Sequence, residues 1–252
     1  AETVTDAEGE VAALIYPAEC PETVPVRPDV VELPRVTSAL VLDPLPPHRP
    51  IRIVRPSSVE KTPNPDRVLA TRLEESADPE GARLYGTALH ALLQHLGRVD
   101  PGQRPQVAMR ALEVLLPTAP DQHAPLAAKA LSIMGRPELA EIFGSDSRAE
   151  VPFFAEAMKG SEPIRIIGRV DRLVVQPGLV RIVDFKSDAR PALTAAEVNP
   201  AYVTQLGLYA LVATQLFPGL RVEAGILWTS LEKLVDLPRD VLAEATRSFT
   251  MR

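Results

Sequence analysis

The segment from Pro163 to Lys186 constrains the fold most strongly. Two runs rich in Ile and Val, Pro163–Val175 and Leu179–Lys186, are separated only by Gln176-Pro177-Gly178. β-Branched residues favour strands, and Pro followed by Gly is a turn signal. The sequence therefore predicts an antiparallel hairpin, and a turn centred on Pro177-Gly178 places Asp171 directly opposite Asp184.

These two opposed aspartates suggest a metal-binding site. Like charges facing each other across a strand pair are destabilising unless something positive lies between them. Carboxylate oxygens suit Mg²⁺ or Mn²⁺. Lys186 follows Asp184 by two residues and so shares its face, where it could orient a water and stabilise charge developing on a phosphate. The same spacing also fits a salt-bridged strand end that faces solvent.

The rest of the C-terminal part predicts an α/β domain. Leucines recur at helical spacing over Ala82–Leu96, and Gly97 ends that helix. Asn199-Pro200 is a helix start, with Asn as the N-cap, and this helix runs to about Phe217. The other predicted elements are helices at Gln106–Leu116, Ala124–Met134, Pro137–Phe143 and Pro238–Phe249, and strands at Arg148–Met158, Arg221–Ser230 and Leu231–Leu237.

The first 65 residues differ in composition. They hold 12 of the 26 prolines, and residues 1–60 carry 10 acidic and 5 basic residues. We therefore expect a Pro-rich acidic linker or arm over residues 1–65 and a folded domain over 66–252. Within the arm, a short helix at Glu8–Ile15 and a short strand at Ile51–Val54 are possible. The chain begins at Ala1 without Met, which suggests a fragment of a longer polypeptide.

Composition excludes several classes of protein. The net charge of −6 argues against a simple basic nucleic-acid binder, although an enzyme can meet phosphate through a metal ion. One cysteine, Cys20, excludes a disulfide framework, a Cys-rich zinc site and a four-Cys iron–sulfur cluster. There is no apolar run long enough for a membrane span and no secretory signal, so we expect a cytoplasmic protein. The G-x-x-x-x-G-K-[ST] motif of ATPase motors does not occur in the sequence, so we expect no such motor within the chain.

Five short sequence motifs occur along the chain in an order that is typical of one family. With them, the chain resembles the nuclease domain of RecB and AddA, within the PD-(D/E)XK nuclease superfamily, over about Ser57 to Ser230. The motifs are Gly86-Thr87-Ala88-Leu89-His90, Glu150-Val151-Pro152-Phe153, Gly168-Arg169-Val170-Asp171-Arg172-Leu173, Ile182-Val183-Asp184-Phe185-Lys186-Ser187 and Tyr202-Val203-Thr204-Gln205-Leu206-Gly207-Leu208-Tyr209.

The resemblance implies a restriction-endonuclease-like αβββαβ core with extra helices. It implies Mg²⁺, with Mn²⁺ as a substitute, held by His90, Asp171, Asp184 and the carbonyl of Phe185. Lys186 would be the catalytic lysine. Gln205 and Tyr209, one helical turn apart and on one face with Tyr202, would position the lysine, the metal or the DNA.

The resemblance also implies a biological setting. Such a domain hydrolyses DNA phosphodiesters as an exonuclease, fed with single strands by a helicase motor N-terminal to it, and works with an AddB partner in double-strand break repair. Alternatives stay open: a catalytically silent module that guides DNA or docks a partner, or a stand-alone nuclease. For single residues, packing alone could explain His90, Gln205 and Tyr209, and Glu150 could be only a strand anchor.

Overall fold

The computed structural model describes residues 2–5, 11–15, 51–57, 79–188 and 190–252, and the chain divides into two compact units, Ala1–His48 and Arg49–Arg252. In the first unit, β1 (Glu2–Thr5) pairs antiparallel with β2 (Val11–Ile15). The helix expected over Glu8–Ile15 is therefore wrong for Val11–Ile15, whose backbone pairs with a neighbouring strand. Most of the predicted arm lies outside the described residues.

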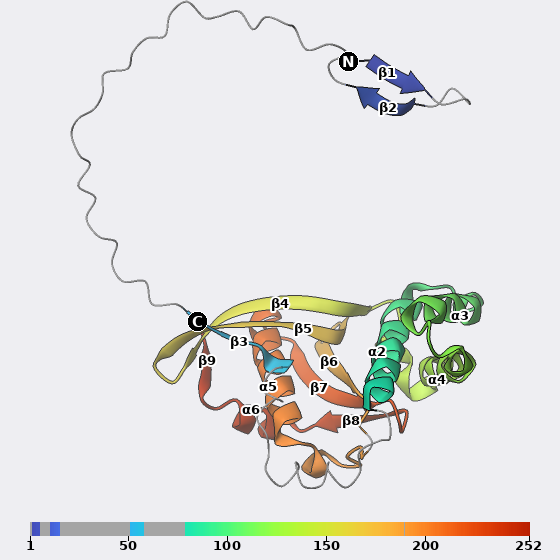
Figure 1. Ribbon diagram of the computed structural model, residues 1–252. Helices are drawn as coiled ribbons and strands as arrows, with labels where there is room; N and C mark the ends of the chain where they lie inside the picture. The colour runs from blue at the N-terminus through green and yellow to red at the C-terminus, as the bar shows by residue number, and fades with distance from the viewer. Residues whose placement is uncertain (1, 6–10, 16–50, 58–78, 189) are drawn as a thin grey trace, which may run out of the picture. The chain divides into compact units, whose positions relative to one another are not determined.

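The second unit is built on one mixed sheet, with the strand order β8-β7-β6-β5-β4-β9 (Figure 1). A short strand, β3, pairs in parallel with β5, although it lies within the range expected to be an arm. The strands are β3 (Arg52–Val54), β4 (Ser147–Lys159), β5 (Glu162–Gln176), β6 (Leu179–Lys186), β7 (Arg221–Trp228), β8 (Lys233–Leu237) and β9 (Phe249–Met251).

Helices connect and cover these strands. The α-helices are α2 (Pro79–His95), α3 (Arg104–Leu115), α4 (His123–Gly135), α5 (Pro200–Leu216) and α6 (Arg239–Ala245), and the 3₁₀ helices are η2 (Leu96–Arg98), η3 (Pro120–Gln122), η4 (Pro137–Phe143) and η5 (Ala195–Glu197). The predicted order of helix, three strands, helix and strand is thus confirmed. None of the helices among the described residues has the length and apolar character that a membrane crossing requires.

The β5–β6 hairpin has the predicted register. Its pairs run from Gln176↔Leu179 to Arg172↔Val183, and Gly178 takes the positive φ of 79° that the turn needs. After β6 the chain crosses through α5 to β7, which lies parallel to β6. Asn199 caps α5 as expected, because its side chain accepts a hydrogen bond from the amide of Ala201 at 3.0 Å.

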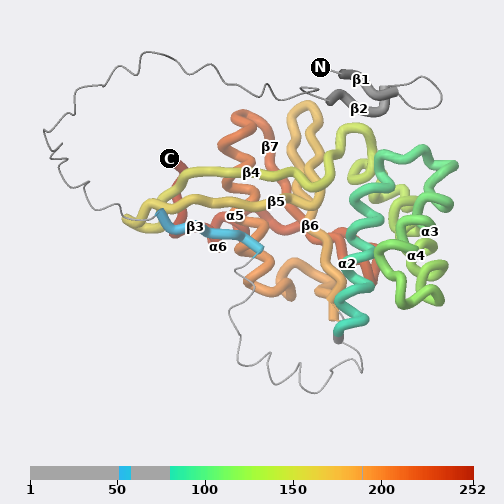
Figure 2. The backbone as a smooth tube through the Cα atoms, turned by 45° about the horizontal axis from the view of Figure 1, so that its top comes forward, coloured from blue at the N-terminus to red at the C-terminus, as the bar shows by residue number. Residues whose placement is uncertain are grey.

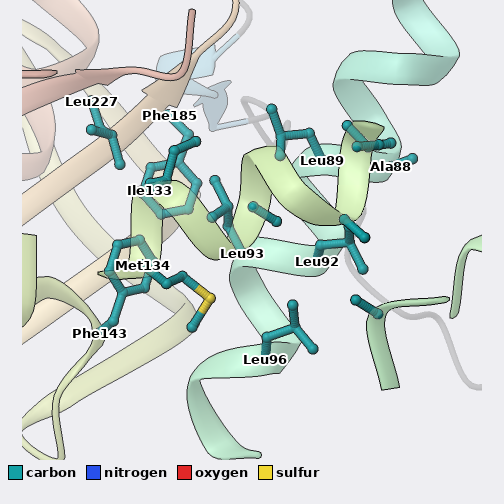
Figure 3. Close-up of a cluster of buried hydrophobic side chains, with 14 of the residues drawn as sticks. Ala88, Leu89, Leu92, Leu93, Leu96, Ile133, Met134, Phe143, Phe185 and Leu227 are labelled. Atoms are coloured by element: carbon teal, nitrogen blue, oxygen red, sulfur yellow. The ribbon is translucent and has the colours of Figure 1, made fainter. Parts of the chain in front are cut away.

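Successive side chains along β6 point to opposite faces of the sheet, so the buried residues of this strand belong to two separate core clusters. Val183 and Phe185 pack with Leu227 against the helical layer of α2, α3, α4 and η4, where Leu89, Leu92 and Leu93 are buried (Figure 3). Ile182 and its neighbours on β7 pack on the other side, against α5 and α6. The second half of β6 runs beside α2 in both views (Figures 1 and 2). The carboxyl end of β6 is therefore enclosed between α2 and α5.

The C-terminal segment differs from the prediction. A single helix was expected over Pro238–Phe249, but α6 ends at Ala245 and the chain then forms β9, which pairs with the end of β4. Helical periodicity alone could not reveal this, because an unpaired edge of β4 is available only in the folded sheet.

Glu232 fixes the β7–β8 turn to α4. It has a positive φ of 54°, and its carboxylate accepts hydrogen bonds from Lys129, Ser132 and Arg136 at 2.7–2.9 Å. These bonds, Lys129 first, lower the pKa of Glu232 to about 2. The folded state therefore favours the ionised carboxylate, and this contribution to stability is present above an unfolded pKa of about 4.3 and is lost as pH falls through about 2.

We predict that Glu232→Gln lowers the free energy of unfolding by about 1–2 kcal/mol at pH 7, because it weakens three hydrogen bonds to a charged group. Urea unfolding should show the gap between wild type and variant shrinking as pH is lowered from 7 toward 2. Glu138→Gln is the control, since Glu138 is exposed and pairs with Arg136 on the surface; it should change the stability far less, because solvent screens such a pair. Equal losses for the two variants would contradict the account.

Candidate active site

Asp184 is a buried carboxylate near the end of β6, with only 4% of the residue exposed. Its Oδ1 accepts a hydrogen bond from Gln205 Nε2 on α5 at 2.9 Å. Its Oδ2 lies 3.1 Å from the ammonium of Lys186. Apart from this ion pair, the buried Oδ2 has no hydrogen-bond donor among the described residues. One oxygen of Asp184 thus remains able to bind a further positive group.

Lys186 is held by α5. Its ammonium donates to Gln205 Oε1 at 3.2 Å and lies 4.4 Å from the centre of the Tyr202 ring. The same Gln205 donates to the hydroxyl of Tyr209 at 3.0 Å. Because residues three and four positions apart share one helix face, Tyr202, Gln205 and Tyr209 form a continuous row beneath Asp184 and Lys186.

Two residues close to this row were given no role of their own by the sequence analysis, although Gly168 opens one of the five motifs. The Tyr202 hydroxyl donates to both carboxylate oxygens of Asp188 at 3.0 Å, which fixes the ring under Lys186. Gly168 lies where a Cβ atom would come within 2.6 Å of the Phe153 ring and 3.3 Å of Tyr209. Any larger residue would displace the Phe153 ring and crowd the Tyr209 ring that bonds to Gln205.

Asp171 and His90 approach the end of β6 from the other side. Asp171 Oδ2 accepts a hydrogen bond from the amide of Phe185 at 2.7 Å. His90 Nε2, on α2, donates to the carbonyl of Phe185 at 2.9 Å and lies 3.9 Å from Asp171 Oδ2. The imidazole also meets the Phe185 ring edge-on at 5.3 Å. The structure therefore brings His90, Asp171 and the Phe185 carbonyl together.

Arg172 explains how α2 is held in place; it belongs to one of the five motifs, but sequence reasoning gave it no role. This residue is only 2% exposed, and its guanidinium donates to the carbonyls of Leu93 and Gln94 in the last turn of α2. It also stacks over the Phe143 ring at 5.1 Å. A cation suits the carbonyl end of a helix. Burial, followed by the nearby Arg98, lowers the pKa of Arg172 to about 10. Because Arg172 follows Asp171 directly, it ties the helix of His90 to the strand of Asp171.

The backbone is irregular where Asp171 lies. Glu150 on β4 has a positive φ of 55°, and the register on either side places it opposite Asp171. Val170 and Leu173 pack into the same cluster although strict alternation would put them on opposite faces. The carboxylate of Glu150 is bound by Gln94 and by Arg169. We infer that Glu150 stabilises the local change of direction.

The two carboxylates affect each other electrostatically. Burial, followed by the negative charge of Asp171, raises the pKa of Asp184 well above its usual range, and Lys186 opposes this shift only in part. Burial also raises the pKa of Tyr209, so its hydroxyl stays protonated at neutral pH. An additional positive charge at this place would relieve the repulsion.

The donor set fits a hard divalent cation. Carboxylate and carbonyl oxygens with one imidazole suit Mn²⁺ or Mg²⁺. His90 Nε2 and the Phe185 carbonyl oxygen lie 2.9 Å apart, so both are near one place, where His90 would bind a cation with its proton on Nδ1 instead of Nε2. Within the described ranges no group of three or more His, Cys, Asp and Glu side chains is already gathered for a metal. This agrees with Asp184 being turned toward Lys186 and Gln205.

We predict that Asp184→Asn raises the melting temperature of the metal-free protein at pH 8. A raised pKa means that folding favours the protonated form, so this contribution is fully present below about pH 3.9 and is lost as pH rises through the raised folded pKa. In EDTA, the wild type should therefore lose stability between pH 5 and pH 8, whereas Asp184→Asn should lose less. A variant that melts below the wild type at pH 8 would contradict this electrostatic account.

Comparisons with known proteins agree with the fold. The sequence matches the PD-(D/E)XK nuclease superfamily over residues 66–246. It is 26% identical over 72 residues to an ATP-dependent helicase/nuclease subunit of Oenococcus oeni (strain ATCC BAA-331 / PSU-1), a stretch covering 29% of this chain and 6% of that protein. The chain thus spans a small part of that relative's length. The crystal structure of SSO0001 is similar at a TM-score of 0.29 with 14% identity, covering 67% of this chain and 83% of that one, too distant to carry an argument.

The superfamily match covers more than half of the chain and includes every residue of the candidate site. The order of elements along the chain, with one helix, three strands, a helix and a strand, is the one that the sequence led us to expect. The protein therefore belongs to the PD-(D/E)XK nuclease superfamily.

Proposed function

We propose that this chain is a divalent-metal-dependent deoxyribonuclease that hydrolyses phosphodiester bonds, with Mg²⁺ as the ion and Mn²⁺ as a substitute. The observation that carries the proposal is the pairing of Asp184 and Lys186, two residues apart on β6 and bridged by one side chain, Gln205. A buried carboxylate with an unsatisfied oxygen beside a fixed ammonium is costly for a purely structural strand end.

The cation would be held by Asp171, Asp184, His90 and the carbonyl of Phe185. When bound, it would supply Lewis acidity to the phosphate and neutralise developing charge. Arg172 and the Phe185 amide contribute by fixing the ligands, since one holds α2 and the other holds the Asp171 carboxylate. Rigid support of this kind keeps ligand atoms in place without the cost of ordering them during the reaction.

The remaining groups act on the water and the phosphate. The oxygen of the attacking water forms a bond to phosphorus, the bond to the 3′ oxygen breaks, one proton leaves the water and one is taken up by the 3′ oxygen. Lys186 orients that water and stabilises the charge on the phosphate. Gln205 holds Lys186 and Asp184 together, Tyr209 holds Gln205, and Tyr202 shields the ammonium from one side.

The wider setting follows from the similarity to a helicase/nuclease protein. We propose an AddA-like exonuclease domain over residues 66–252, preceded by an arm over 1–65, in a cytoplasmic enzyme of double-strand break repair. A helicase motor N-terminal to the chain would supply single-stranded DNA, and an AddB-like protein would be the partner. The net charge of −6 supports this arrangement, because tight DNA binding would come from the rest of the assembly.

We predict that Lys186→Ala and Lys186→Arg each slow Mg²⁺-dependent cleavage of single-stranded DNA by roughly a hundredfold or more. Arginine keeps the charge, but its planar guanidinium does not fit between Gln205 and the Tyr202 ring as a compact ammonium does. Rates are measured on a labelled oligonucleotide with saturating metal.

The control is Lys129→Arg, because Lys129 pairs with Glu232 away from the site and should tolerate a larger cation. Circular dichroism should confirm that all variants fold. Near-normal cleavage by folded Lys186→Arg would show that only the charge matters there, and no metal-dependent cleavage by the wild type would refute the proposed function.

A further inference from the structure

A groove of about 490 Å³ lies beside the candidate site, between one face of α2 and the end of β6. The residues that line it are Ala82, Arg83, Gly86, Thr87, His90, Ala91, Gln94, Phe185, Lys186 and Ser187. It contains both His90 and Lys186, so it opens directly onto the atoms proposed to carry the chemistry.

The charge of this groove is unusual for the chain. The protein has a net charge of −6, yet no Asp or Glu of the described ranges lines the groove, while Arg83, Lys186 and His90 do. Thr87, Gln94 and Ser187 add neutral hydrogen-bonding groups. Such a lining suits an extended anion whose charges repeat along its length, as they do in a nucleic-acid backbone.

Arg83 is the cation farthest from the catalytic atoms. It is exposed, and among the described residues its guanidinium makes no ion pair. It precedes His90 by seven residues, which is two helical turns on nearly the same face of α2, or about 10 Å along the axis. An arginine at that distance could contact a phosphate a few nucleotides from the cleaved bond.

Gly86 keeps the groove open between these two ends. A Cβ atom at this position would lie 3.0 Å from Ser187 Oγ, tighter than normal packing allows. The helix therefore crosses the residue after β6 at a point where only glycine fits without displacement. Ala82 and Ala91 also line the groove, and their short side chains leave space along this face of α2.

A larger cavity of about 940 Å³ shares Ala82, Gly86 and Ser187 with the groove but extends to the other side of α2. Its lining includes Glu80 and Asp121, and Lys129, which also lines it, is already paired with Glu232. A polyanion would be repelled there. The charges thus favour one of the two paths away from the site.

We infer that this groove binds the backbone of a DNA strand, with Arg83 contacting a phosphate remote from the cleaved bond. The inference rests on the proposed nuclease function for the identity of the strand, but it concerns binding and can be tested without cleavage. It assigns to Arg83 a role in holding the substrate and none in the chemical step.

The test measures binding of a fluorescein-labelled thymidine oligonucleotide to the full chain by anisotropy, in Ca²⁺, which takes the same oxygen ligands as Mg²⁺. Four proteins are compared: wild type, Arg83→Ala, Arg83→Glu and Arg110→Ala. Arg110 is exposed on α3, so its loss changes the net charge equally. The dissociation constant is measured at several salt concentrations.

Loss of one phosphate contact should weaken binding about fivefold near 0.1 M salt and lower the slope of log K against log salt by about 0.7. Arg83→Ala should show both changes and Arg110→Ala neither, while Arg83→Glu should weaken binding further. Equal behaviour of the Arg83 and Arg110 variants, or no binding by the wild type, would overturn the inference. Cleavage assays judge the nuclease function separately, so the two ideas can fail independently.

Discussion

The burial of the Asp184 carboxylate near the end of β6, within the electrostatic reach of a second carboxylate, Asp171, is the constraint on which the surrounding structure depends. Asp171 raises the free energy of the charged form, and burial raises it more. Lys186 and Gln205 compensate in part from the side of α5. A strand end built in this way gains most when a cation binds, because the cation relieves the repulsion and satisfies the remaining oxygen.

The rest of the fold keeps one helix on each side of that strand end, α5 on one side and α2 on the other. Asn199 starts α5 at the point from which Gln205 reaches Asp184. On the other side, Arg172 holds the last turn of α2, and Gly97 leaves room for it, because a Cβ atom there would lie 2.8 Å from the guanidinium. The bonds from Gln205 to Asp184 and from Arg172 to α2 join elements that are distant in sequence, so the geometry of the site depends on the completed domain.

Local signals predicted much of this arrangement. The Pro177-Gly178 turn predicted the register of the β5–β6 hairpin, which the strand pairs follow as far as Arg172↔Val183. Helical spacing put Tyr202, Gln205 and Tyr209 on one face. Such features depend on neighbouring residues, so they can be read from sequence alone. The family resemblance, rather than spacing, indicated that His90 would lie near Asp171.

Features that depend on tertiary contacts were missed. Arg172 looked like any charged strand residue, because nothing local shows that the end of α2 lies above it. Asp188 follows β6 in a loop, and its bond to Tyr202 exists only once α5 packs on the sheet. The positive φ of Glu150 and the strand β9 likewise arise from the assembled sheet. Sequence therefore indicated the candidate catalytic side chains better than the residues that position them.

The central claim is that His90, Asp171, Asp184 and the Phe185 carbonyl form one divalent-cation site. Calorimetric titration with Mn²⁺ of wild type, His90→Ala and His95→Ala tests it most directly, since His95 is exposed on the same helix and serves as the matched control. The account predicts one class of binding for the wild type and His95→Ala, and an affinity at least roughly tenfold weaker for His90→Ala. Equal Mn²⁺ affinity for the two folded variants would contradict it and leave His90 as a packing residue.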